Sequence, residues 1–278
     1  MRKKNLLKVS ILAPIAFLMI AVGVDALWIE PDWLEVVRTT IPSKRIPSEF
    51  EGYQVAQLSD LHVSDDRSVA RLHKAIDEIM AIKPDLIVLT GDFITMGVFR
   101  KEDELTAELS RLSAPDGVYA VRGNHDWWIN VERVTAAIER SGVKLLNNQN
   151  IKIQRAGADL YLAGVDDFWE AKADLGTAMD GIPSDAGAIL LAHEPDFAVN
   201  ASQDRRIFLQ LSGHSHGGQV QLPFIGPIFT PRMAKIYKVG LYTVDDMQLY
   251  VNRGTGLIFP SVRFLSRPEV AIFTLSNR

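Results

Sequence analysis

The 278-residue chain contains no cysteine, which excludes disulfide bridges, thiolate zinc sites and a cysteine nucleophile. It also lacks a strong excess of either charge, because 30 basic and 34 acidic residues give a formal net charge of −4. We therefore expect no basic surface of the kind that binds a nucleic-acid backbone. Any metal site in this chain must use nitrogen and oxygen ligands.

The N-terminal segment differs in character from the rest of the chain. An uncharged apolar run at 9–24 follows a basic segment at 2–8. A helix of this length spans about 24 Å, and residues 26–29 extend it toward the roughly 30 Å of a bilayer core. We expect residues 1–30 to be a signal anchor, with a cleaved signal peptide or a buried core helix as alternatives.

The basic flank predicts the orientation of this segment. Basic flanks stay in the cytoplasm, so we expect the rest of the chain on the extracytoplasmic side of the inner membrane. It would be released there if the signal is cleaved. Residues 31–52 contain prolines and are expected to be a connector, followed by one large domain at 53–278.

Hydrophobic periodicity predicts the fold of that domain. Strand-like apolar runs first alternate with helical stripes at 69–80, 105–112 and 131–138, whereas strands predominate from residue 144 onward. Asp245-Asp246 predicts a hairpin turn. This pattern favours an α/β fold, a four-layer α/β/β/α sandwich of two mixed sheets. The expected strands are 54–58, 86–89, 118–121, 151–154, 160–163, 189–192, 208–211, 237–244, 248–252 and 270–275.

Side chains of the kinds that ligate metals follow five of these strands. They are Asp60, His62, Asp92, Asn124, His125, His193, His214 and His216. Ligands in α/β folds bind at the carboxyl ends of strands, which is where all of these residues fall. Asp-x-His and His-x-His spacing also places two side chains on one side of an extended segment. The sequence therefore predicts a dinuclear metal site.

Each segment alone also has an ordinary structural explanation. Asp-x-His is common by chance, Thr-Gly-Asp is usually a turn, and Asp126 is suited to capping a helix. His193 alone would be satisfied by a backbone carbonyl, and His73, on a charged helical stretch, is expected to be solvated. The functional interpretation is favoured because five such segments coincide in one chain.

The ordered segments Asp-x-His, Gly-Asp, Gly-Asn-His-Asp, His and Gly-His-Ser-His resemble the calcineurin-like metallophosphoesterase superfamily from Val55 onward. The stretch Gly-His-Ser-His-Gly-Gly-Gln, the N-terminal anchor and the segments 252–256 and 267–269 are similar to the bacterial YaeI/YkuE-like phosphodiesterase branch. The resemblance implies the calcineurin-like fold and hydrolysis of a phosphodiester or pyrophosphate. It also implies a lipid-linked or nucleotide-sugar substrate such as UDP-2,3-diacylglucosamine.

The resemblance assigns seven ligands to two divalent ions: Asp60, His62 and His216 to the first, Asn124, His193 and His214 to the second, and Asp92 to both. It implies manganese, although the ligands also suit iron or zinc and do not exclude magnesium. A hydroxide shared by the two ions would be the nucleophile. His125 is left over, so we expect it to protonate or hydrogen-bond the leaving oxygen, with Asp126 orienting it.

Several alternatives stay open. The apolar loops 93–99 and 223–229 suit either a lipid-linked substrate or ordinary loop packing. Arg253 is either a phosphate contact or part of a structural ion pair. Protein-phosphatase relatives carry an Arg shortly after Gly-Asp and a Glu after Gly-Asn-His, and their absence here disfavours a phosphomonoesterase. A non-catalytic, membrane-tethered metal-binding module is the alternative from a different functional class.

Overall fold

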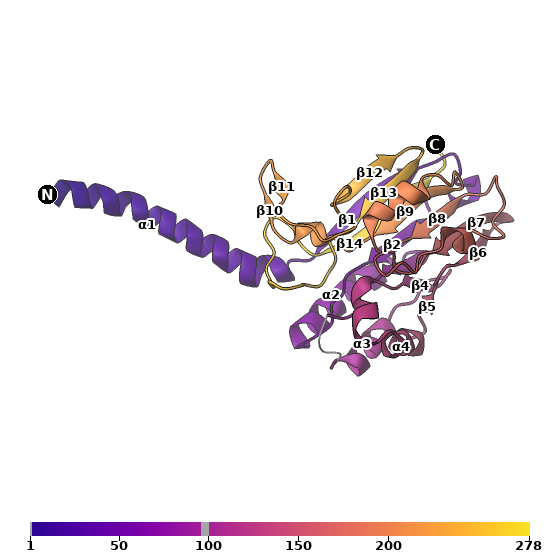
Figure 1. Cartoon of the computed structure of the whole chain (residues 1–278), viewed down its shortest axis with the longest axis horizontal. Coiled ribbons are helices and arrows are strands. Elements are labelled where there is room, and N and C mark those ends of the chain that lie inside the picture. The colour runs from indigo at the N-terminus through magenta and orange to yellow at the C-terminus, as the bar shows by residue number, and fades with distance from the viewer. Residues whose placement is uncertain (1, 96–99) are drawn as a thin grey trace.

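The computed structural model describes residues 2–95 and 100–278, with side chains described from residue 13. Two six-stranded β-sheets pack face to face and form the body of the protein (Figure 1). Part of the predicted apolar loop 93–99, residues 96–99, lies outside the described residues.

The first sheet combines parallel central strands with strands from both ends of the domain. Its spatial order is β1 (Glu35–Pro42), β14 (Glu269–Ser276), β2 (Gln54–Leu58), β3 (Leu86–Thr90), β4 (Val118–Val121) and β5 (Lys144–Leu145). β2 to β5 run parallel, whereas β14 is antiparallel to β2. The fully buried pattern of β3 and β4 is typical of strands covered on both faces.

The second sheet has parallel central strands and antiparallel edges. Its order is β12 (Gly240–Val244), β13 (Met247–Val251), β9 (Ile207–Ser212), β8 (Ala188–Leu191), β7 (Ala158–Gly164) and β6 (Gln149–Arg155). The predicted Asp245-Asp246 turn joins β12 to β13, which pair antiparallel from Val244 and Met247 outward.

Apolar side chains separate the molecule into four layers. One cluster fills the space between the two sheets. Another lies between the first sheet and the helices α2 (Asp66–Ile82), α3 (Glu102–Leu109) and α4 (Asn124–Arg140). The outer face of the second sheet is covered by loops, the 3-10 turn η4 (Pro195–Phe197) and the short helices α5 (Leu175–Ala178) and α6 (Ala198–Ala201). The predicted four-layer fold is therefore confirmed, with a thin fourth layer.

Strand β1 lies within the segment 31–52, which we expected to be a connector. All eight of its residues pair in parallel with β14, so this segment belongs to the first sheet. The β-branched residues Val36, Val37, Thr39, Thr40 and Ile41 favour a strand. The prolines on either side directed the sequence interpretation toward a loop, and a short 3-10 turn, η3 (Ser48–Phe50), does follow β1.

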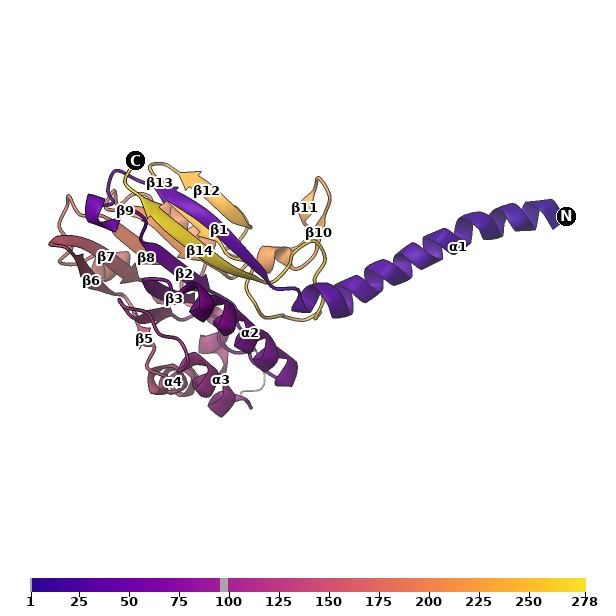
Figure 2. The ribbon, with the colours of Figure 1, turned by 180° about the vertical axis from the view of Figure 1, so that it is seen from behind.

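The N-terminal helix α1 (Arg2–Val24) projects away from the body (Figures 1 and 2). It continues through the π-helical turn η1 (Asp25–Ile29) and the 3-10 turn η2 (Glu30–Asp32). The stretch Ala13–Asp32 is long and apolar enough to cross a membrane, and only 6% of it is buried. The alternative of a buried core helix is therefore wrong, and the segment suits a membrane anchor.

Candidate metal centre

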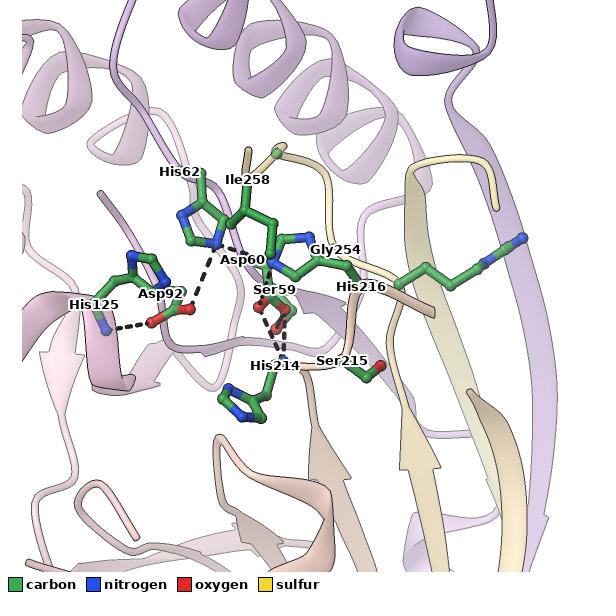
Figure 3. Close-up of polar contacts among 12 residues, drawn as sticks. Ser59, Asp60, His62, Asp92, His125, His214, Ser215, His216, Gly254 and Ile258 are labelled. Atoms are coloured by element: carbon green, nitrogen blue, oxygen red, sulfur yellow. Dashed lines mark hydrogen bonds and ion pairs between the residues drawn. The ribbon is translucent and has the colours of Figure 1, made fainter. Parts of the chain in front are cut away.

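The two sheets bring the carboxyl ends of their parallel strands to one edge of the molecule. β2, β3 and β4 approach this edge from the first sheet, and β8 and β9 from the second. The turn after each of these strands carries predicted site residues. Figure 3 shows Asp60 and Asp92 surrounded by histidine side chains from three of these turns.

The backbone at the site is bent into tight turns. Five predicted ligands have φ between 46° and 68°, in the left-handed region: Asp60, His62, Asp92, His214 and His216. Residues other than glycine adopt this region at a cost of about 1–3 kcal/mol, and such strain concentrates at functional sites. The Asp-x-His and His-x-His pairs thus lie in tight turns. The expectation that each pair lies on an extended segment is wrong.

The first group of ligand atoms belongs to Asp60, His62, Asp92 and His216, all of them buried. Nε2 of His62 lies 3.4 Å from Oδ2 of Asp92 and 3.0 Å from Nε2 of His216. The same nitrogen of His216 lies 3.4 Å from Oδ1 of Asp60. The four side chains thus direct donor atoms toward one small volume.

The second group belongs to Asp92, His193 and His214, which are also buried. Nε2 of His193 lies 3.3 Å from Oδ2 of Asp92 and 3.2 Å from Nδ1 of His214. The Asp92 carboxylate is therefore common to both groups, and its bridging of two ions stays a prediction.

Backbone carbonyls orient the ring nitrogens that face away from the centre. Nδ1 of His193 lies 2.6 Å from the carbonyl of Thr90, and Nδ1 of His62 lies 3.1 Å from the carbonyl of Ile94. Nε2 of His214 lies 2.7 Å from the carbonyl of Arg232. Such contacts fix the tautomer of a metal-ligating histidine, leaving its other nitrogen free to bind.

Asn124 provides a direct test of whether the site suits metal ions. Its side-chain oxygen is buried at the start of α4 and has no hydrogen-bond partner within the described residues. A buried polar atom without a partner costs about 1–3 kcal/mol, which a bound cation would offset. The surrounding imidazoles and carboxylates are the nitrogen and oxygen donors that Mn, Fe and Zn accept. The residues therefore fit a pair of divalent ions.

The electrostatics of the site also suit cations. Burial lowers the pKa of His62 to about 3 and that of His214 to about 4, so both imidazoles are neutral near pH 7 and able to bind a metal. Burial alone would lower the pKa of His193 and raise that of Asp92. Their mutual attraction instead holds the pKa of His193 well above and that of Asp92 well below its usual value, so a metal ion that binds His193 would displace a proton from it. An ionised carboxylate therefore lies at the centre.

Asp126 caps a helix, the ordinary structural role that its position suggested. Its carboxylate accepts hydrogen bonds from the backbone N–H groups of Asp92, Phe93 and Gly123, at 2.9–3.0 Å. It thus caps α4 and ties this helix to the turn that carries the shared carboxylate. These contacts orient the backbone of Asp92, and the expected orienting of the His125 side chain by Asp126 stays a prediction.

His125 lies at the mouth of the site and belongs to neither ligand group. Its backbone N–H donates to Oδ1 of Asp92 over 2.9 Å. Its ring centroid is 4.8 Å from that of His62 and 4.9 Å from that of Trp128. The side chain is half-buried, so it borders both the ligand cluster and the space that a substrate would enter.

Sequence reasoning missed an aromatic wall at this mouth, formed by Trp128 and Trp169. Their rings are 5.4 Å apart, and Trp169 lies 5.6 Å from His214. The wall thus runs from His125 to His214. A signal was present, because three of the five tryptophans occur in the segments 127–128 and 169, close to predicted site residues.

Arg253 is held by carboxylates. Nη2 lies 2.9 Å from Oε2 of Glu35, and Nε donates to Oε2 of the buried Glu269 over 2.5 Å. The side chain thus links β1, β14 and the loop after β13, which supports the structural ion pair among the two alternatives. The neighbouring Gly254 packs so closely on the site that a Cβ there would lie 2.6 Å from Cβ of Asp60.

The sequence that forms this site matches a known protein family. The profile described as calcineurin-like phosphoesterase matches residues 53–218, more than half of the chain. The chain belongs to the calcineurin-like phosphoesterase family. The sequence predictions of this family and of a phosphoric diester hydrolase are confirmed.

Three relatives indicate the branch to which this phosphoesterase is similar. It is 36% identical to an uncharacterised metallophosphoesterase, YkuE of Bacillus subtilis, over 91% of this chain and 89% of YkuE. It is 28% identical to phosphodiesterase YaeI of Escherichia coli, over 88% and 90% of the two chains. The UDP-2,3-diacylglucosamine pyrophosphatase LpxG of Chlamydia muridarum is 25% identical, over 88% and 90%.

Proposed function

We propose that this phosphoesterase binds two divalent metal ions, with manganese the first expectation, and uses them to hydrolyse a phosphodiester or pyrophosphate bond. The main support for this proposal is that the Asp92 carboxylate belongs to both groups of candidate ligands. Asp60, His62 and His216 would hold one ion. Asn124, His193 and His214 would hold the other.

The residues around the two ions have separate roles in the proposed reaction. When bound, the two ions supply Lewis acidity and an activated hydroxide as the nucleophile. Asp92 balances positive charge between the ligand groups, and Asp126 fixes its backbone through three hydrogen bonds. His125 borders the mouth and would donate a proton to the leaving oxygen, which stabilises the negative charge that develops on a phosphate or alkoxide leaving group.

The substrate that we propose is a lipid-linked nucleotide sugar such as UDP-2,3-diacylglucosamine. The name of the relative LpxG supports this choice. The wall of Trp128 and Trp169 supports it independently, because aromatic side chains stack on the faces of nucleobases. The exposed apolar helix α1 also supports this choice, because an enzyme anchored by it would lie beside lipid substrates.

We propose that α1 is an uncleaved anchor and that the body lies on the extracytoplasmic side, because the basic segment 2–8 favours a cytoplasmic N-terminus. The absence of cysteine makes this testable with the single variant Ser184→Cys, at an exposed position of the body. A membrane-impermeant maleimide should label it in intact spheroplasts. Labelling only after lysis would contradict the orientation.

The decisive experiment combines metal analysis with product analysis. Purified full-length enzyme should contain two metal ions per chain and convert UDP-2,3-diacylglucosamine to UMP and the diacylglucosamine phosphate, followed by ³¹P NMR. Reaction in H₂¹⁸O should place the label on the phosphorus that is attacked. Turnover of p-nitrophenyl phosphate in preference to bis(p-nitrophenyl) phosphate would indicate a phosphomonoesterase. No turnover of any ester with two metals bound would indicate a binding module.

A further inference from the structure

Five large apolar side chains are exposed on one surface beside the metal centre. We call this surface the apolar rim: Phe224, Ile225, Ile228, Phe229 and Phe259. The first four belong to or adjoin the hairpin of β10 (Gln221–Leu222) and β11 (Gly226–Pro227), and Phe259 lies on the loop after β13. Each is at least 60% exposed, and an apolar group of this size marks an interaction surface.

The rim is fixed in position relative to α1. The loop of Phe259 continues to Arg263, whose backbone N–H donates to the carbonyl of Ala26 over 3.0 Å. Next to it, the buried carboxylate of Glu30 accepts the backbone N–H groups of Leu265 and Ser266, at 2.8 and 2.5 Å. Figures 1 and 2 both show β10 and β11 beside the end of α1 that joins the body. A membrane that contains α1 would therefore lie close to the rim.

The base of α1 carries residues typical of a membrane interface. Trp28 and Trp33 are both more than half exposed, and the guanidinium of Arg267 lies 3.7 Å from the ring centroid of Trp33. Tryptophan and basic side chains gather at the boundary between lipid and water. The boundary is thus predicted near residues 28–33, at the same end of the body as the rim.

Charge around the hairpin suits an anionic membrane surface. No aspartate or glutamate occurs between residues 213 and 244, a segment that contains Arg232, Lys235 and Lys238. Arg232 and Lys235 are exposed just after the hairpin. Each basic side chain near an anionic bilayer contributes about 1 kcal/mol to binding, and no acidic neighbour in this segment opposes it.

A cleft of about 360 Å³ lies beside the metal centre and is lined by residues of the rim and by one candidate ligand. Ile228 and Phe229 of the rim line it together with Ile258 and Val262, and the ligand His216 lines it as well. The walls are mostly apolar, and the volume falls within the range of about 300–1,000 Å³ for ligand pockets. An apolar chain bound in this cleft would thus contact both the rim and the turn that carries His216.

Gln219 couples the two walls of this cleft. Its side-chain nitrogen donates to the carbonyls of Ile258 and Pro260, at 3.1 and 3.0 Å, and its side-chain oxygen accepts the N–H of Ile258 over 2.8 Å. Gln219 lies three residues after the ligand His216, so these bonds hold the apolar loop against the metal-binding turn. These hydrogen bonds therefore hold the two walls of the cleft in a fixed arrangement.

We propose that the apolar rim inserts into the membrane that α1 enters, and that the cleft receives an acyl chain of the substrate directly from the bilayer. The acyl part of this inference rests on the proposed lipid substrate. The headgroup would then reach the ligand cluster while its chain stays in an apolar environment, so the lipid need not leave the membrane completely.

Insertion of the rim can be measured without reference to activity. Because the chain has no cysteine, the variants Phe224→Cys and Phe259→Cys each accept a single nitroxide label, with Ser184→Cys as the matched control. Full-length protein in nanodiscs of phosphatidylglycerol and phosphatidylcholine should show greater collision with O₂ than with a nickel chelate at 224 and 259. The label at 184 should show the reverse. Rim labels that behave like the control would overturn insertion.

Occupation of the cleft predicts a dependence on acyl-chain length. The wild type should prefer long-chain over short-chain UDP-2,3-diacylglucosamine in kcat/KM. Val262→Trp, which fills the cleft, should reduce this preference by about tenfold or more. Ile236→Trp, at an exposed apolar position outside the cleft lining, should retain it.

The possible failures are distinguishable. An unchanged chain-length preference in Val262→Trp overturns acyl binding in the cleft and leaves the proposed substrate intact. If the wild type hydrolyses bis(p-nitrophenyl) phosphate but neither lipid, the proposed substrate and acyl binding both fail. The spin-label depths still decide insertion of the rim in that case.

Discussion

The ligand cluster and the apolar rim lie side by side but are built in opposite ways. The cluster consists of buried polar groups on left-handed turns, oriented by backbone carbonyls and by Asp126. The rim consists of exposed apolar side chains. Changes in the cluster should therefore affect every substrate, whereas changes in the rim should affect only substrates in a membrane. This difference separates the chemistry of the site from its choice of substrate.

The sharpest test of the cluster is Asp92→Asn. Both ligand groups share this carboxylate, and its charge is paired with His193, so the amide should bind neither ion tightly. We expect turnover of all phosphodiesters to fall to background and the metal content to fall below two ions per chain. Activity assays and elemental analysis of the purified variant measure the two effects.

Chelation provides the control for this variant. Removing the ions from the wild type should lower its melting temperature, because a ligand that binds only the folded state stabilises it. The melting temperature of Asp92→Asn should change little with the same chelator. Two bound metals and normal activity in Asp92→Asn would contradict a bridging carboxylate and would remove the main distinction between the cluster and its surroundings.

The next largest effect is expected for His125→Ala. Loss of a positioned acid typically lowers kcat by about 10²-fold or more, while the ligands themselves remain in place. Metal content should stay at two ions per chain. The loss should be greater for diesters with alkoxide leaving groups than for p-nitrophenyl esters, because p-nitrophenolate needs little protonation. Equal losses of metal and turnover would identify His125 as a structural residue or a ligand.

Two glycines allow the cluster and the rim to be compared through the same substitution. Gly254 and Gly226 both have positive φ, at 70° and 81°, but only at Gly254 would a Cβ collide with a ligand, Asp60. Gly226 lies in the rim hairpin, with nothing within 4 Å of an added Cβ. Gly254→Ala should therefore weaken metal binding by about 10–100-fold, comparable to the loss of other supporting contacts.

Gly226→Ala should lower the stability of the protein through backbone strain alone. Its metal affinity should equal that of the wild type. Calorimetric titration of the metal-free proteins measures both affinities, and thermal denaturation reports the strain separately. Equal metal affinities in the two variants would show that Gly254 does not hold Asp60 in place.

The strands and the clustering of the candidate ligands could be predicted because both depend on local patterns. The predicted strands 54–58 and 118–121 coincide with β2 and β4, since each is a short apolar run. Placing ligands after such strands required only the rule that carboxyl ends of parallel strands face one edge. Strand β1 was missed because the prolines near it outweighed its β-branched residues, and its partner, β14, lies more than 220 residues away in sequence.

Side-chain roles that depend on long-range contacts were not predictable. The place of Asp126 after His125 gave no sign that its carboxylate also accepts hydrogen bonds from the turn after β3, more than thirty residues earlier. The left-handed turns at Asp60 and His62 were not predicted either, because aspartate and histidine, although enriched in that region, adopt it at only a small share of their positions. The cleft joins loops from two separate segments, so the sequence indicated only that each loop is apolar.

The smallest predicted effect concerns the aromatic wall, which lies between the cluster and the solvent. Trp169→Ala removes one ring of the wall, and stacking of one base contributes about 1–3 kcal/mol. We expect KM for UDP-2,3-diacylglucosamine to rise about tenfold, with bis(p-nitrophenyl) phosphate nearly unaffected, and Trp169→Phe to restore most of the loss. A fall in kcat for both substrates would show instead that Trp169 supports His214, which its ring contacts at 5.6 Å. The wall would then belong with the chemistry of the cluster, and the rim and cleft alone would distinguish the substrate.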